Sequence, residues 1–153
     1  MTERYVVASD AIRNRYLQDG AGVVPPARLL VMVYDKLVLD LEQALEGLPV
    51  SDWDLVSRKL INAQAIVLEL HSALKLDAWD GAAGLSELYK WFDSELTLAN
   101  VRKSEKHIRP VLKMVRELRG AWVQASEQVL TEQAAATAAA RASVPSMALG
   151  NPA

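Results

Sequence analysis

Residues 51–74 read SDWDLVSRKLINAQAIVLELHSAL, and this stretch does most to decide the fold. Its apolar side chains recur at alternating steps of four and three residues, which places them along one side of an α-helix. Ser51 precedes the row and Asp54 follows three residues later, so we expect Ser51 to cap the helix. The stretch predicts an amphipathic helix, and its apolar row consists of Val56, Leu60, Ala63, Val67, Leu70 and Leu74.

Three more segments carry the same helical period, over residues 27–48, 85–102 and 104–140. Pro25 and Pro26 open the first of them, because proline is tolerated in the first turn of a helix and not further in. In the last of them the apolar residues keep heptad spacing over most of its length. The chain therefore predicts four amphipathic helices.

Short breaks separate these segments, and the break at 77–84 contains two glycines and Trp79, which we expect to be exposed. Pro110 lies about a turn inside the last segment, where it would kink the helix or delay its start. No alternation typical of strands appears. Short loops between helices of similar length place neighbours antiparallel, so the predicted fold is all-α, an up-down-up-down four-helix bundle.

The two ends of the chain do not fit the bundle, which we expect to span residues 25–133. Residues 1–24 contain apolar pairs followed by Gly20-Ala21-Gly22, and they predict a mobile N-terminal arm or a short extra helix. Residues 134–153 are rich in alanine and end in a stretch with two prolines and a glycine. They predict a fraying helix and a disordered tail.

The composition excludes several classes of protein. The chain has no cysteine, which excludes disulfides and a thiol nucleophile, and its formal net charge of −2 argues against nucleic acid and anionic membranes as main partners. The N-terminus lacks the pattern of a secretory signal, and no apolar run approaches the roughly 20 residues of a membrane span. We therefore expect a cytoplasmic protein without membrane insertion.

The sequence offers little to support catalysis. His71 and His107 do not follow a glutamate by three residues, so the ligand spacing of a di-metal bundle is missing. No phosphate-binding loop and no nucleophile elbow appear. We expect no enzyme, no metal and no cofactor, and we expect a solvated helix surface for the carboxylates Asp35, Asp40, Glu42, Glu69 and Glu95.

The apolar residues outside the main rows point to a partner. Trp122 and Phe92 lie on the rows and are expected in the core. Eight further apolar residues lie outside the rows, and they suggest more apolar helix surface than four helices alone would cover. A client helix, self-association, or the N-terminal arm could cover them. These residues are Tyr34, Trp53, Trp79, Trp91, Leu30, Leu39, Ile66 and Leu98.

Several stretches together resemble the flagellin export chaperone FliS family over residues 11–130. Tyr16 precedes PARLLVMVYD at 26–35, and KLINAQAIVLEL follows at 59–70. LSELYKWF at 85–92 comes next, and Ala99-Asn100 and Ala121-Trp122 complete the pattern at the family's separations. Lys36, Trp79 and Pro110 depart from the pattern and leave the local shape of a groove open.

The resemblance implies a cytoplasmic antiparallel bundle that binds the C-terminal segment of flagellin, prevents premature polymerisation and delivers flagellin to the type III export gate. It also implies an arm, with Ile12, Tyr16 and Leu17, that covers the groove when no client is bound. The rival hypothesis is a structural bundle that forms homo-oligomers and ignores flagellin. The groove residues implied are Met32, Val33, Asn62, Ala63, Ile66, Leu88, Tyr89, Phe92 and Leu96.

Overall fold

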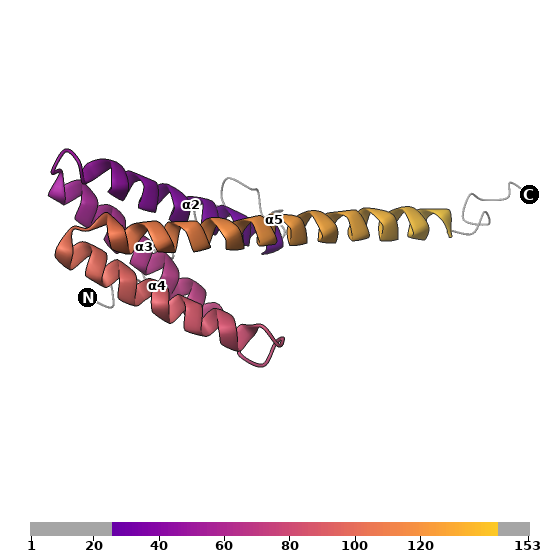
Figure 1. The fold of residues 1–153 in the computed structure, drawn as a ribbon. Helices are drawn as coiled ribbons and strands as arrows, with labels where there is room; N and C mark the ends of the chain where they lie inside the picture. The colour runs from indigo at the N-terminus through magenta and orange to yellow at the C-terminus, as the bar shows by residue number, and fades with distance from the viewer. Residues whose placement is uncertain (1–25, 144–153) are drawn as a thin grey trace, which may run out of the picture.

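The computed structural model describes residues 26–143, which form four helices and no strand. The helices are α2 (Pro26–Gly47), α3 (Trp53–Ala73), α4 (Ala82–Arg102) and α5 (Glu105–Ala142). Each helix runs antiparallel to the next (Figure 1). α2 packs against α3 and α5, and α4 packs against α3 and α5, so the four helices close into a ring. The predicted up-down-up-down bundle is confirmed.

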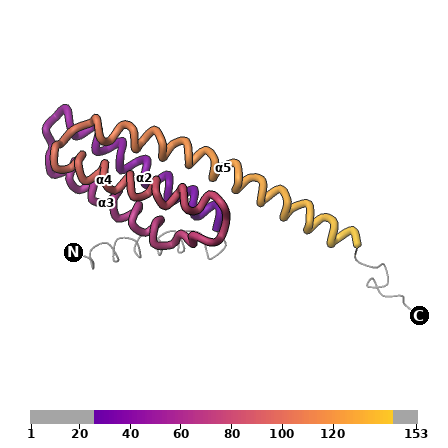
Figure 2. Tube along the Cα trace, turned by 60° about the horizontal axis from the view of Figure 1, so that its bottom comes forward, coloured from indigo at the N-terminus to yellow at the C-terminus, as the bar shows by residue number. Residues whose placement is uncertain are grey.

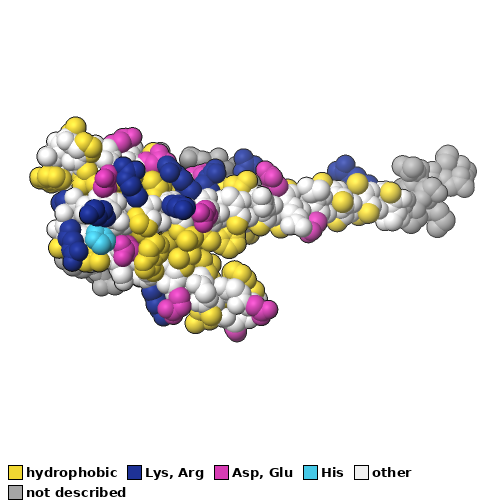
Figure 3. Space-filling view, in the orientation of Figure 1, with side chains coloured by type: hydrophobic (Ala, Val, Ile, Leu, Met, Phe, Trp, Pro, Cys, Tyr) yellow, Lys and Arg dark blue, Asp and Glu magenta, His cyan; other side chains and the backbone are white. Residues whose placement is uncertain are grey.

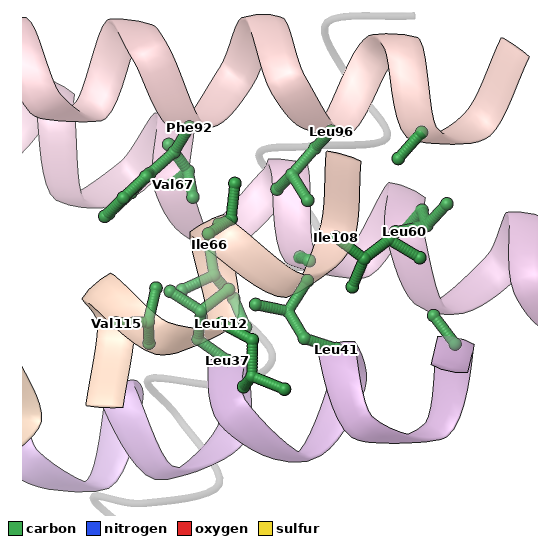
Figure 4. Packing of buried hydrophobic residues seen from close by; sticks show 14 of the residues in the cluster. Leu37, Leu41, Leu60, Ile66, Val67, Phe92, Leu96, Ile108, Leu112 and Val115 are labelled. Atoms are coloured by element: carbon green, nitrogen blue, oxygen red, sulfur yellow. The ribbon is translucent and has the colours of Figure 1, made fainter. Parts of the chain in front are cut away.

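The core lies inside this ring and receives side chains from all four helices. Figure 4 shows Leu37 and Leu41 of α2 meeting Ile108, Leu112 and Val115 of α5. The predicted apolar row of α3 faces the same core, with Leu74 partly buried at the helix end. The heptad spacing read from the sequence therefore identifies the inward side of each helix correctly.

Two helix starts differ from the sequence-based expectation. Asp52, and not Ser51, caps α3, because its carboxylate accepts a hydrogen bond of 3.1 Å from the backbone N–H of Leu55. α4 begins at Ala82, three residues earlier than predicted, so that Gly84 lies inside the helix. α5 begins at Glu105 after its cap Ser104, and Pro110 therefore does not delay its start.

Two residues expected outside the core are buried. Tyr34 is fully buried and Ile66 is 2% exposed, although both lie off the predicted rows. A helix in a closed ring touches two neighbours, so it buries a wider face than a two-stranded seam does. The apolar surface left over for a partner is therefore smaller than the sequence suggested.

α5 is much longer than the other helices, with 38 residues against 21 or 22. Its C-terminal part continues through the Ala-rich segment to Ala142 and projects beyond the other three helices (Figure 2). At this end of the bundle, the N-terminal part of α4 and the loop that joins it to α3 lie away from α5 (Figure 1). Within residues 26–143, no helix is long and apolar enough to cross a membrane.

Candidate functional site

The structure divides the nine predicted groove residues into two groups. Five lie in the core with at most 2% of their surface exposed: Ala63, Ile66, Tyr89, Phe92 and Leu96. Four are partly exposed: Met32, Val33, Asn62 and Leu88. The predicted arm residues Ile12, Tyr16 and Leu17 lie outside the described residues. The buried five could meet a client only if the bundle opened.

A polar contact shows which sides of α4 and α5 face each other. His107 Nδ1 and Glu95 Oε2 are 2.7 Å apart, in a hydrogen bond that joins the two helices. Leu88 and Trp91 precede Glu95 by seven and four residues, so they lie on this same side of α4. α4 and α5 diverge toward the N-terminal end of α4 (Figure 1), and Leu88 and Trp91 belong to this diverging part of α4.

The opposite wall of this space comes from α5. Met114 follows His107 by seven residues and Leu118 follows by eleven, so they lie on the side of α5 that faces α4. Both are partly buried against the core, as are Leu88 and Trp122, while Trp91 remains 37% exposed. Figure 3 shows hydrophobic side chains gathered where the molecule forks between these two helices. We call these five residues, Leu88, Trp91, Met114, Leu118 and Trp122, the apolar cleft.

Buried aromatic side chains form the floor beneath the cleft. The hydroxyl oxygens of Tyr34 and Tyr89 are 2.7 Å apart and join α2 to α4 across the core. The rings of Tyr34 and Trp122 pack edge to face, with their centroids 6.2 Å apart. The ring of Phe92 contacts the rings of both Tyr89 and Trp91. This ring cluster packs against the partly buried Trp122 and the more exposed Trp91 of the cleft.

The two phenols should make stability fall in alkaline solution. Burial raises the pKa of Tyr34 and of Tyr89 above the usual value near 10. Above about pH 10 the unfolded phenols lose protons first, so the unfolded state binds fewer protons and the free energy of unfolding decreases. Each phenol adds a slope of about 1.4 kcal/mol per pH unit.

This slope can be measured by urea unfolding between pH 9 and 11. The double variant Tyr34→Phe/Tyr89→Phe removes both hydroxyls of the pair together, so neither hydroxyl is left without the other. We expect its free energy of unfolding to fall less steeply with pH than that of the parent chain. An identical slope in the two proteins would show that the phenols ionise as readily when folded as when unfolded.

One carboxylate expected on the solvated surface lies inside the bundle instead. Asp40 is fully buried, and Lys36 Nζ approaches its Oδ1 to 2.5 Å while Lys59 Nζ of α3 lies 4.0 Å away. Burial raises the pKa of Asp40, and the two lysines act against that rise. The expectation for Asp40 was wrong because a carboxylate one turn from a lysine of its own helix can still face a neighbouring helix.

The remaining polar groups give no sign of a catalytic centre. His71 Nε2 lies 2.8 Å from Ser86 Oγ, and His107 is engaged by Glu95. Among the described residues, no three His, Cys, Asp or Glu side chains are grouped so that they could hold a metal ion. A shallow depression between α3 and α4 is lined by charged and apolar side chains alike, among them His71, Lys90 and Asp93. The apolar cleft is therefore the better candidate site.

Sequence reasoning missed most of the cleft. It named Leu88 as a groove residue, expected Trp122 in the core, noted Trp91 only as an apolar residue outside the main rows, and did not single out Met114. The signal for Trp91 was its position one turn before Glu95 on α4. Nothing in the sequence shows that α4 and α5 diverge, and this divergence is what leaves their facing side chains uncovered.

Comparison with known proteins gives three results. The family model of the flagellar protein FliS matches residues 8–129. The flagellar secretion chaperone FliS of Bacillus subtilis (strain 168) is 26% identical over 118 residues, which cover 75% of this chain and 88% of the relative. A solved crystal structure of a flagellar chaperone from bacteria superposes with a TM-score of 0.64 at 19% identity, over 78% of this chain and 98% of that one.

Proposed function

Because this chain belongs to the FliS family of flagellar chaperones, we propose that its client is flagellin and that the apolar cleft holds the client's C-terminal segment. The chain is then a cytoplasmic export chaperone. It prevents premature polymerisation of flagellin and supports its type III secretion. The family is one of chaperones and not of enzymes, so the work done on the client is burial of surface and no bond is made or broken.

The observation that carries the proposal is the exposed apolar surface between α4 and α5. Trp91 is 37% exposed and Met114 is only partly buried in the region where the helices diverge. An amphipathic client helix laid into such a groove removes apolar surface from water on both partners, at roughly 25 cal/mol per Å². Part of this gain is spent on ordering a segment that is unfolded when free.

The other partly exposed residues of the predicted groove extend the proposal. Met32 and Val33 lie on α2 and Asn62 lies on α3, so these three residues are not part of the cleft between α4 and α5. A client segment that continued past α4 around the bundle would reach them. Of the five buried residues, Tyr89 and Phe92 belong to the aromatic cluster that lies beneath the cleft. We propose that residues 25–133 form the chaperone domain and that residues 1–24 compete with the client for the groove.

The test is calorimetric titration of the whole chain with a synthetic C-terminal segment of flagellin. We expect a one-to-one complex with a negative heat-capacity change, the mark of buried apolar surface. A matched segment with its apolar face changed to serine should not bind. A protein that stays a homodimer in light scattering and gives no heat with the native segment would instead favour the self-associating bundle.

A further inference from the structure

A row of cations occupies the outward side of α5. Lys106, Arg109, Lys113 and Arg116 follow one another at steps of three, four and three residues, and all four are exposed. This spacing places them on one side of the helix, opposite the buried row that includes Ile108, Val111 and Val115. Figure 3 shows dark-blue side chains in line along α5. We call these four residues the basic ridge.

Part of the basic ridge works against the stability of its own helix. Lys106 stands in the first turn of α5, where the helix dipole disfavours positive charge. Each cation also has a like charge three or four residues away, and such pairs repel on a helix. The stability of α5 therefore does not account for Lys106 and Lys113, which have no ion pair to offset this repulsion within residues 26–143.

Within the described residues, only two of the four cations of the basic ridge have a carboxylate partner. Arg109 pairs with Glu105 at 2.9 Å, and Arg116 pairs with Glu42 of α2 at 3.0 Å. Within residues 26–143, no carboxylate oxygen lies within 4.0 Å of the Lys106 or Lys113 ammonium group. Two cations seven residues apart, or two helical turns, therefore point into solvent without a counter-charge from the described part of the molecule.

We propose that the basic ridge docks an acidic surface of a partner protein, such as a helix with carboxylates at matching steps. Carboxylates at the edges of the ridge, Glu105, Glu117 and Glu42, would repel a continuous polyphosphate but can pair with a protein surface of mixed sign. The net charge of −2 for the whole chain also disfavours nucleic acid.

This surface is separate from the apolar cleft. By their spacing from His107, Met114 and Leu118 lie on the side of α5 that faces α4, whereas Lys113 is exposed on the outward side. A client in the cleft and an acidic partner on the ridge can therefore be held together. The inference does not depend on the identity of the client, so it can fail while the proposed function stands, and the reverse.

The test compares two charge reversals of equal size in the full chain. The probe is a 21-residue helical peptide with glutamates at steps of three and four, and fluorescence anisotropy reads its binding at low and at physiological salt. Lys106→Glu/Lys113→Glu should weaken binding at least tenfold. Arg58→Glu/Lys90→Glu alters two exposed cations away from the ridge and should change binding less than twofold. Binding by the parent chain should weaken as salt rises.

A milder variant separates binding from folding. Lys106→Gln/Lys113→Gln removes the unfavourable charges, so it should raise the melting temperature while it weakens peptide binding. A lower melting temperature would show that the cations stabilise α5 and would overturn the argument. Equal loss of peptide binding in both charge-reversal variants would show that the peptide responds to the net charge of the chain and not to the ridge. Tighter binding to a 20-residue oligothymidylate or to phosphatidylserine vesicles than to the peptide would assign the ridge to phosphate surfaces instead.

Discussion

Replacing Ile66 with aspartate should unfold most of the bundle. Ile66 of α3 is 2% exposed and belongs to the core cluster that all four helices share. An unpaired carboxylate at this place loses its hydration and also leaves the volume of the isoleucine side chain unfilled. We expect the free energy of unfolding to fall by about 4 kcal/mol or more, against a total of about 5–15 kcal/mol for a domain.

Ile61 provides a matched control on the same helix. It is 37% exposed on the outer side of α3, so the carboxylate of Ile61→Asp can remain hydrated. Circular dichroism should show a native spectrum and a small change in melting temperature for Ile61→Asp, and loss of helix signal for Ile66→Asp. An Ile66→Asp protein that folds but no longer binds flagellin would show that Ile66 contacts the client, as the family resemblance implied.

Replacing Trp91 with alanine should lower the affinity for the flagellin segment by roughly 30-fold or more, as loss of a central aromatic contact does. Trp91 is partly exposed at the apolar cleft, and its ring packs against the buried ring of Phe92 at 5.7 Å. An aromatic side chain fixed from beneath loses little conformational freedom on binding, so most of its buried surface contributes to affinity. The measurement is titration with the same synthetic segment.

Trp53 is the control for this substitution, because it is 47% exposed at the first position of α3, at the opposite end of the bundle from the opening of the cleft. Trp53→Ala should bind as the parent chain does. Melting curves of both variants should show that each is folded at the temperature of titration. Equal affinity for Trp91→Ala and the parent chain would place the client elsewhere, with the α2–α3 side as the next surface to test.

The sequence predicted what depends on neighbours along one helix. The heptad rows gave the four helices and their inward sides, since a period near 3.6 residues puts such side chains on one face whatever the surroundings. Ser104 was expected at the start of α5 and caps it. Ser51 failed as a cap because Asp52, one residue later, offers a carboxylate at the right place.

The same spacing rules could not predict contacts between helices. Asp40 shows this, because its burial depends on how α3 approaches α2, and a row of charges along α2 contains no such information. Tyr34 shows it too, since its hydroxyl pairs with Tyr89, 55 residues away. Burial of these groups follows from the packing of whole helices in the ring.

The sequence by itself determined an all-α bundle of four antiparallel helices, because apolar period and turn residues are local properties. Only the tertiary structure decided where the bundle leaves apolar surface uncovered. Leu88 and Trp91 lie on the side of α4 that faces α5, and Met114 and Leu118 on the side of α5 that faces α4, where the two helices diverge beyond the Glu95–His107 contact. The angle between two helices is set by all the side chains packed between them, and no single row of residues encodes it.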